Sequence, residues 1–163
     1  MLSDRLAHGL EVVFCGTAAS HASAAMGHYY AGPGNRFWPL LAETGLTPRR
    51  FAPSEDHLLL SLGIGLTDLA KDVCGMDRDI PKAAYAPDRL AAVIAEFRPK
   101  RLAFTSLTAA KIGLGIRCPA GRAEAPRFPD LAVWVLPSPS GAARATFDAA
   151  PWHDLGNHVR GAL

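Results

Sequence analysis

The chain has 163 residues, of which 49% are hydrophobic, and this length suits a single domain built around one core. Its formal net charge of +2 is a weak basic excess that neither requires nor excludes a polyanionic partner. The amino terminus has no charged leader before a long apolar run, and no stretch is apolar enough to cross a bilayer, so we expect one cytoplasmic domain over residues 1–163.

The first predicted elements are a strand and a helix. A branched apolar run over residues 12–15, closed by Gly16, favours a buried strand over a helix. After a loop rich in small residues, Asn35 can cap a helix that carries several large apolar side chains and ends at Gly45. The chain therefore starts with a strand, a long loop and a helix.

The middle of the chain continues this alternation. Ser54 is expected to cap a helix that runs through Leu62, and residues 64–66 predict a short second strand. The clearest amphipathic helix begins at Asp88, has apolar residues at the i, i+3, i+4 and i+7 positions, and ends before Pro99.

The carboxyl-terminal third predicts two further strands and two helices. Residues 102–104 form a buried strand, and Thr105 or Ser106 caps the helix that follows it. Residues 132–136 form the last strand, before a helical tail headed by Pro151.

Strands that are apolar throughout, alternating with helices, indicate an α/β fold with a parallel sheet covered on both faces. We predict a three-layer α/β/α sandwich around a central, mostly parallel sheet of four strands. Ligands bind beyond the carboxyl ends of such strands. We therefore expect the chemistry in the four segments that follow Cys15, Leu66, Phe104 and Leu136.

Three isolated cysteines, Cys15, Cys74 and Cys118, form no CxxC pair. Three such thiols cannot by themselves provide a disulfide framework or a four-thiolate metal or iron–sulfur site. We expect reduced packing residues, and no metal or other cofactor.

The loop after the first strand and the loop after the last strand both contain residues suited to a ligand site. In the first loop, small residues let backbone N–H groups approach a ligand, and Tyr30 can stack on a planar base. A tight turn with a core aromatic is the structural alternative. The last loop, residues 136–144, joins prolines, serines and a glycine to Arg144, which suits insertion into a narrow groove.

Basic residues are concentrated between Arg98 and Arg127. This segment contains seven of them and a single acidic residue, Glu124. Such a bias could follow a phosphate backbone, or it could be an ordinary solvated basic face. Thr105 and Ser106 at a helix amino terminus could likewise bind phosphate or simply cap the helix.

Together and in this order, three blocks closely resemble the uracil-DNA glycosylase superfamily, in particular its mismatch-specific uracil/thymine branch. The blocks are Gly9-Leu10 with Val12-Val13-Phe14-Cys15-Gly16, then Asn35-Arg36-Phe37-Trp38, then Val135-Leu136-Pro137 with Pro139-Ser140-Gly141. Tyr29-Tyr30 with the following Pro-x-Asn-x-Phe-Trp block is also similar to the hypoxanthine-DNA glycosylase branch. The resemblance covers most of the chain.

The resemblance implies roles for individual positions. Base-binding residues would be Gly16, Thr17, Ala18, Ser20, Tyr30 and Asn35, with Tyr30 as the stacking aromatic. DNA-binding residues would be Ser138, Ser140, Gly141, Ala142, Ala143 and Arg144, with Ser106 added from its place at a helix start.

Two positions depart from the pattern of the mismatch-specific branch, which has Asn where this chain has Ala18 and Ser138. Ala18 predicts a slower enzyme or a relocated water-binding group, because stabilising charge lowers most of the barrier to base departure. We expect Asn35 or His21 to be the catalytic residue, with Ser20 as a further candidate. Asn35 could instead only cap a helix, and His21 could be an exposed loop residue.

The predicted function is that of a monofunctional DNA repair glycosylase, acting in base excision repair. It would flip uracil out of double-stranded DNA, hydrolyse the N-glycosidic bond, and leave free uracil and an abasic site. We expect a monomer with no membrane partner, associated with the nucleoid through DNA. The alternatives are a hypoxanthine-DNA glycosylase and a non-catalytic binder of damaged or abasic DNA.

Overall fold

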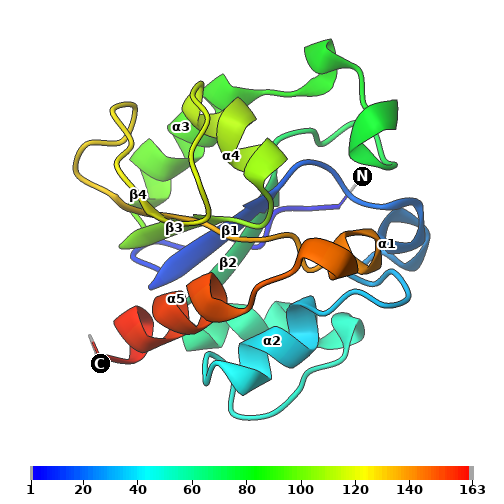
Figure 1. Cartoon of the computed structure of the whole chain (residues 1–163), viewed down its shortest axis with the longest axis horizontal. Coiled ribbons are helices and arrows are strands. Elements are labelled where there is room, and N and C mark those ends of the chain that lie inside the picture. Colours follow the sequence, from blue (N-terminus) through cyan, green and yellow to red (C-terminus); the bar gives the residue numbers. More distant parts are fainter. Residues whose placement is uncertain (1, 162–163) are drawn as a thin grey trace.

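A five-stranded sheet in the order β2-β1-β3-β5-β4 forms the centre of the molecule (Figure 1). The computed structural model describes residues 2–161. Four strands run parallel, namely β1 (Val12–Gly16), β2 (Ile64–Asp68), β3 (Arg101–Phe104) and β5 (Ala132–Val135). The edge strand β4 (Gly121–Ala123) is antiparallel to β5.

The four parallel strands are the four that the sequence predicts, so the expected fold class is confirmed and only the strand count changes, from four to five. β4 was missed because it has three residues, one of them the exposed Arg122, and no apolar run. A short polar strand can exist at the edge because only one side of it pairs with the sheet.

Helices cover both faces of the sheet (Figure 1), with α3 (Pro87–Phe97) and α4 (Leu107–Leu114) on one face and α2 (Phe37–Glu43) and α5 (Ala150–Gly161) on the other. Side chains of a strand alternate between faces. Accordingly, Phe14 of β1 joins the core under α2 and α5, whereas its neighbours join the core under α3 and α4. Two apolar layers therefore enclose the sheet, as predicted.

Of two predicted helix caps, only the one at α4 is confirmed. At α2 the N-cap position belongs to Arg36, which makes no side-chain cap hydrogen bond, and Asn35 lies one residue before it. The Asn35 Oδ1 accepts a hydrogen bond of 2.9 Å from the Phe37 N–H at the start of α2. The Ser106 hydroxyl accepts one of 3.0 Å from the Ala109 N–H in α4, so Ser106 rather than Thr105 is the cap. Within residues 2–161, no helix is long and apolar enough to span a bilayer.

Other helix predictions need correction. The segment Pro53–Leu62 is a 3₁₀ helix, η1, and starts from Ala52, not from Ser54, because Glu55 accepts a hydrogen bond from the Ala52 N–H at 2.9 Å. The helices α3 and α5 each begin one residue earlier than predicted, at Pro87 and Ala150.

A six-residue helix, α1 (His21–Met26), lies within the stretch that the sequence indicated as a loop. Ser20 caps α1 by accepting a hydrogen bond of 3.0 Å from the Ser23 N–H, and Gly27 ends it in the left-handed conformation. Three shorter 3₁₀ turns, η2 (Asp77–Asp79), η3 (Lys82–Ala84) and η4 (Gly141–Thr146), complete the described chain.

Candidate functional site

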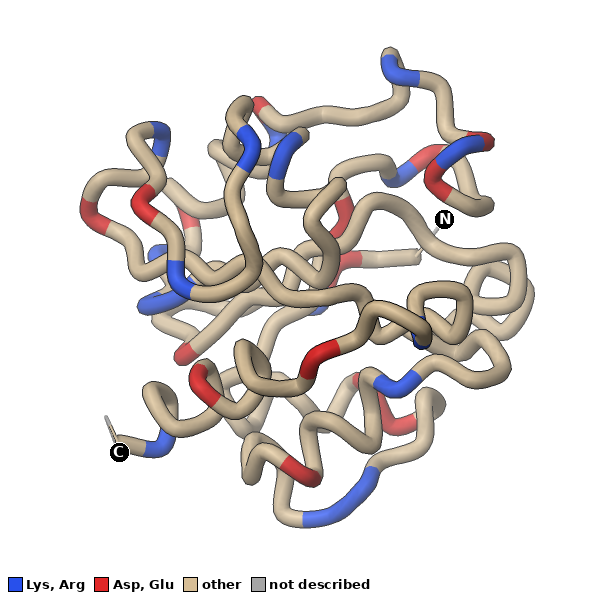
Figure 2. Tube along the Cα trace, viewed as in Figure 1, with Lys and Arg blue, Asp and Glu red and all other residues tan. Residues whose placement is uncertain are grey.

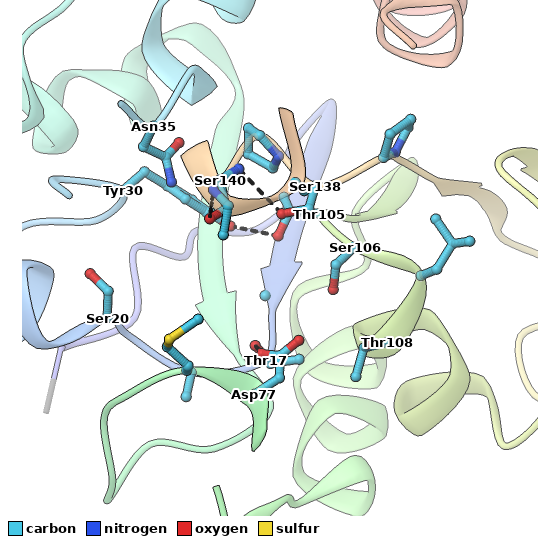
Figure 3. A pocket seen from close by; sticks show the side chains of 18 of the residues that line it. Thr17, Ser20, Tyr30, Asn35, Asp77, Thr105, Ser106, Thr108, Ser138 and Ser140 are labelled. Carbon is cyan, nitrogen blue, oxygen red and sulfur yellow. Dashed lines mark hydrogen bonds between the residues drawn. The ribbon is translucent and has the colours of Figure 1, made fainter. Parts of the chain in front are cut away.

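A cavity of about 740 Å³ lies at the carboxyl ends of the parallel strands, where the sequence analysis placed the site (Figure 3). Its walls come from the segments that follow β1, β2, β3 and β5. The strand order brings these four segments to one edge of the sheet, although they are far apart in the sequence.

The loop before α2 and the loop after β5 are joined directly. The Arg36 N–H donates a hydrogen bond of 2.8 Å to the Pro139 carbonyl. Nearby, a Cβ added to Gly34 would lie 3.8 Å from the Gly141 Cα, so the two backbones pass close to each other. The structure therefore brings together the two sequence blocks that were proposed separately to bind base and DNA.

Four residues line the most buried part of this cavity, which we term the floor: Gly16, Asp68, Thr105 and Tyr30, the last through its hydroxyl. A Cβ added to Gly16 would lie 2.7 Å from the Asp68 Oδ1 and 3.3 Å from both the Thr105 Oγ1 and the Tyr30 Oη. Three side-chain oxygens thus converge on Gly16, and the lack of a side chain there gives them space.

Asp68 is the floor residue that the sequence analysis missed. It is 5% exposed and ends β2, two residues beyond the predicted strand. Burial raises the pKa of its carboxyl to about 6, although Lys71 and Arg89 oppose part of that rise. No hydrogen bond or ion pair reaches the carboxylate from residues 2–161, even though the residue lines the cavity. An acid directly after an apolar strand was the available sequence signal.

Tyr30 is held rigidly in the cavity wall. Its backbone is left-handed (φ 52°), and its ring stacks on Phe37 with centroids 3.9 Å apart. Its hydroxyl lies 3.0 Å from the Thr105 Oγ1. Burial and the nearby Asp68 raise the pKa of Tyr30, so this hydroxyl stays protonated. One ring face is covered by Phe37, and the residue lines the cavity as expected for a stacking aromatic.

Asn35 bonds to the start of α2 and also lines the cavity. Its Oδ1 accepts a hydrogen bond from the Phe37 N–H, the first residue of α2. In Figure 3 its amide nitrogen lies on the side of Tyr30 and Ser140. An amide oxygen keeps a second lone pair and the nitrogen keeps two donors, so Asn35 can bond to the Phe37 N–H and still hold a water molecule.

The segment after Gly16 also lines the cavity, in a fixed conformation. The Thr17 hydroxyl donates a hydrogen bond of 2.6 Å to Asp77 Oδ1, and the Thr17 carbonyl accepts one of 2.8 Å from the Ala70 N–H. The half-buried Ala18 and the cap residue Ser20 follow along the wall. The structure therefore places Gly16, Thr17, Ala18 and Ser20 together, beside Tyr30 and Asn35.

His21 is not among the residues that line the cavity. It starts α1 with an exposed side chain, and its Nδ1 lies 3.5 Å from the Cys74 Sγ. The imidazole therefore contacts the Cys74 thiol at the outside of the loop. Of the two candidate catalytic residues, the structure brings Asn35 to the cavity and leaves His21 outside it.

The outer edge of the cavity, which we term the rim, includes small side chains from the loop after β5, namely Ser138, Ser140, Ala142 and Ala143. Its turns are internally bonded, since the Ser140 N–H donates to the Ser138 hydroxyl at 3.2 Å and the Ala142 N–H donates to the Ser140 hydroxyl at 3.3 Å. Gly141 and Arg144 are exposed on the same loop but do not line the cavity.

Met76, Arg78, Ser106 and Leu107 also line the cavity, from the segments that follow β2 and β3. Met76 and Leu107 are large apolar side chains that are 47% and 48% exposed. Ser106 is partly occupied by capping α4. The rim thus combines small side chains with exposed apolar residues and a cation.

None of the seven basic residues between Arg98 and Arg127 lines the cavity. Arg101 is 4% exposed and pairs with Glu11 at 3.2 Å, and Arg122 lies over the Trp134 ring at 5.1 Å. In Figure 2 basic and acidic positions are interspersed around the chain. The sequence left open whether this segment binds phosphate or is an ordinary basic face. Arg101 and Arg122 at least already have partners within the protein.

Comparisons with known proteins agree with this geometry. Residues 4–156 match the family model of the Uracil DNA glycosylase superfamily. A solution NMR structure of a candidate uracil DNA glycosylase from Methanosarcina acetivorans is similar in fold, with a TM-score of 0.68 and 21% sequence identity. The match covers 98% of this chain and 96% of the archaeal one.

Proposed function

The chain belongs to the uracil DNA glycosylase superfamily, and we propose that it flips uracil out of double-stranded DNA and hydrolyses the N-glycosidic bond. The products would be free uracil and an abasic site in an unbroken strand. We propose further that the protein acts as a monomer and without a metal or other cofactor.

The observation that carries this proposal is the meeting of two loops at one cavity. The loop after β1 supplies small residues and leads to Tyr30 and Asn35, while the loop after β5 supplies the serines of the rim. The hydrogen bond between Arg36 and Pro139 fixes these loops against each other. A base that enters past the rim can stack on Tyr30 and face the backbone of residues 16–18.

DNA contact is assigned to the rim. Ser138, Ser140 and the exposed Arg144 can contact phosphates, which position a duplex without reading its sequence. Across the cavity, Leu107 and Met76 present apolar side chains of the kind that insert between base steps. Both features suit a duplex from which one nucleotide has left the stack.

The chemistry does not require a strong base. Departure of the base leaves an oxocarbenium-like sugar, and preorganised dipoles contribute more to lowering this barrier than proton transfer does. A neutral amide cannot accept a proton, but it can orient a water molecule toward the sugar. We therefore assign this positioning role to Asn35, which lines the cavity, rather than to His21, which does not.

Ala18 leaves this enzyme without a side-chain dipole at that point of the wall. A positioned polar group contributes typically about 10²–10⁴-fold to such a reaction. Asn35, approaching from the start of α2, replaces part of this contribution. The proposed enzyme is therefore active but slow.

The test is base release at enzyme excess from three substrates, U·G and U·A duplexes and a uracil-containing single strand. The proposal predicts free uracil and alkali-labile abasic sites from at least one of them. No release from any of the three would refute it. A non-catalytic reader would bind a duplex that already contains an abasic site and never generate one.

Hypoxanthine is the second candidate base, and it belongs in the same assay. The Tyr29-Tyr30 and Asn35 block favours it, because it is similar to the hypoxanthine branch of the family. Release of hypoxanthine at a higher kcat/KM than uracil would reverse the order of the two bases.

A further inference from the structure

Tyr30 has a backbone conformation that is unfavourable for its side chain. Its φ angle of 52° lies in the left-handed region, where the Cβ crowds the following carbonyl oxygen. Among residues 2–161, the only other residue besides glycine with a positive φ is Arg98, which ends α3. Left-handed residues are common at helix ends, but Tyr30 lies in a loop. Such strain persists only where surrounding contacts fix it, and it is frequent at functional sites.

Buried side chains hold the backbone on both sides of Tyr30. The Tyr29 N–H donates a hydrogen bond of 3.2 Å to the Asp56 Oδ2. On the other side, the Ala31 N–H donates one of 3.0 Å to the Ser23 hydroxyl. Asp56 and Ser23 are 0% and 3% exposed. These contacts fix the path of the backbone, but they do not touch the ring.

The Tyr30 ring is fixed by two further contacts (Figure 3). Phe37 stacks on one of its faces, with 18° between the ring planes. At the tip of the ring, the Tyr30 hydroxyl and the Thr105 hydroxyl form the hydrogen bond of 3.0 Å. Stacking allows a ring to slide within its own plane, whereas a hydrogen bond at the tip sets its position.

Thr105 is suited to this contact because it is itself fixed. It directly follows β3, and its N–H donates a hydrogen bond of 3.0 Å to the Cys15 carbonyl of β1. Its Oγ1 lies 3.5 Å from the same carbonyl, which is the limit of a hydrogen bond, so Tyr30 is its main partner. The hydrogen bond therefore ties the strained loop to the central sheet.

We propose that Thr105 is a positioning residue whose hydroxyl holds the Tyr30 ring in the orientation in which its open face receives the flipped base. This inference rests on the proposed function and adds the residue that keeps the stacking surface in place before DNA binds. A surface that is already ordered costs less free energy to bind than one that must become ordered. Thr105 acts through Tyr30.

The test is a double-mutant cycle on kcat/KM for uracil release from a duplex, with Thr105→Val, Tyr30→Phe and the double variant. Valine keeps nearly the shape of threonine without its hydroxyl, and phenylalanine keeps the stacking ring. Each single variant should lower kcat/KM about fivefold, which corresponds to the loss of one net hydrogen bond. Both changes remove the same contact, so the double variant should also be about fivefold below wild type. A loss of about 25-fold would indicate independent effects and overturn the inference.

Two controls separate positioning from a loss of stability. Thr105→Ser keeps a hydroxyl at the same place and should retain the wild-type kcat/KM. Thr47→Val removes a hydroxyl outside the cavity that is similarly buried, at 3% exposed, and donates a hydrogen bond of 2.8 Å to the Arg49 carbonyl. It should lower stability and leave uracil release unchanged. Equal losses in Thr47→Val and Thr105→Val, or a loss in Thr105→Ser, would show a merely structural role.

The Kd for free uracil distinguishes this inference from the proposed function. If the wild type releases no base, but uracil binds about fivefold more weakly to each single variant and to the double variant, the glycosylase proposal fails and the positioning role of Thr105 holds. If the wild type releases uracil and Thr105→Val releases it equally well, the glycosylase proposal holds and the positioning role fails.

Discussion

The floor and the rim of the cavity differ in burial and in how their residues are held. Floor residues end buried strands or, like Tyr30, stack on the core, and they place three oxygens around Gly16. Rim residues lie in loops and at helix starts, and Leu107 is 48% exposed. Under the proposed function, this difference predicts that the floor contacts the flipped base and the rim contacts the duplex. Substitutions at the two places should therefore have different signatures.

The largest effect is expected at Gly16. In Gly16→Ala the new Cβ would lie 2.7 Å from Asp68 Oδ1, which forces the carboxylate to move. A misplacement of about 1 Å can cost about 10²-fold in rate, so kcat/KM for uracil release should fall about 100-fold. Gly32→Ala is the matched control, because a Cβ there meets only Ser20 Oγ at 3.6 Å. Equal losses in both variants would show that the space at Gly16 has no specific role in base release.

Asp68 should make the folded protein less stable as the pH rises. Its folded pKa is about 6 against an ordinary value of 3.8, so the folded state binds its proton more tightly. Stability from this group is present below the unfolded pKa and lost as the pH rises through the folded pKa.

Urea unfolding of wild type and Asp68→Asn at several pH values tests this effect. The difference in unfolding free energy, wild type minus variant, should fall by about 2 kcal/mol between pH 4 and pH 7. A difference that stays constant over this range would show that Asp68 does not titrate in the folded protein as described.

Asn35 lies between floor and rim, and its substitution should affect turnover more than DNA binding. Asn35→Ala is expected to lower single-turnover base release at least about tenfold while the Kd for duplex DNA stays nearly unchanged. Loss of the hydrogen bond to the Phe37 N–H should also cost about 1 kcal/mol. Asn35→Ser keeps a hydroxyl that can accept this bond, so it should retain stability but not turnover.

Asn157→Ala, on the exposed side of α5, is the control for Asn35 and should behave as wild type. Unchanged turnover in Asn35→Ala would argue against Asn35 and favour His21. That result would require the imidazole to leave Cys74 when DNA binds.

The smallest effect is expected at the rim. Leu107→Ala should lower kcat/KM for a uracil-containing duplex about fivefold and leave the single strand unaffected, because only a stacked duplex needs an apolar insertion. Ile116→Ala is the matched control, since Ile116 is 44% exposed and does not line the cavity. An equal loss on single-stranded substrate would contradict the rim's proposed role.

The fold was largely predictable because its strands are short apolar runs between helices. The residues of β1, β3 and β5 are nearly all buried, which is the pattern that the sequence showed. The site could be located because parallel strands present their carboxyl ends at one edge. The positions of Gly16, Tyr30 and Ser140 relative to the strands were thus enough to predict that they lie at one cavity.

What sequence reasoning missed depends on contacts between distant segments. α1 has only six residues and is set by the bond between Ser20 and Ser23, so the sequence alone indicates a loop at His21. Asp68 looked like an ordinary residue beyond a short strand. Its importance comes from burial beside Gly16 and Thr105, which belong to other strand ends.

The most direct test is a single-turnover reaction of wild-type protein with a duplex that contains one uracil, followed by mass spectrometry. Hydrolysis of the N-glycosidic bond predicts stoichiometric free uracil and an unbroken strand that has lost uracil and gained water. An unchanged strand mass would contradict the proposed hydrolysis. If the same protein still binds an abasic duplex, it would instead be a non-catalytic binder of damaged DNA.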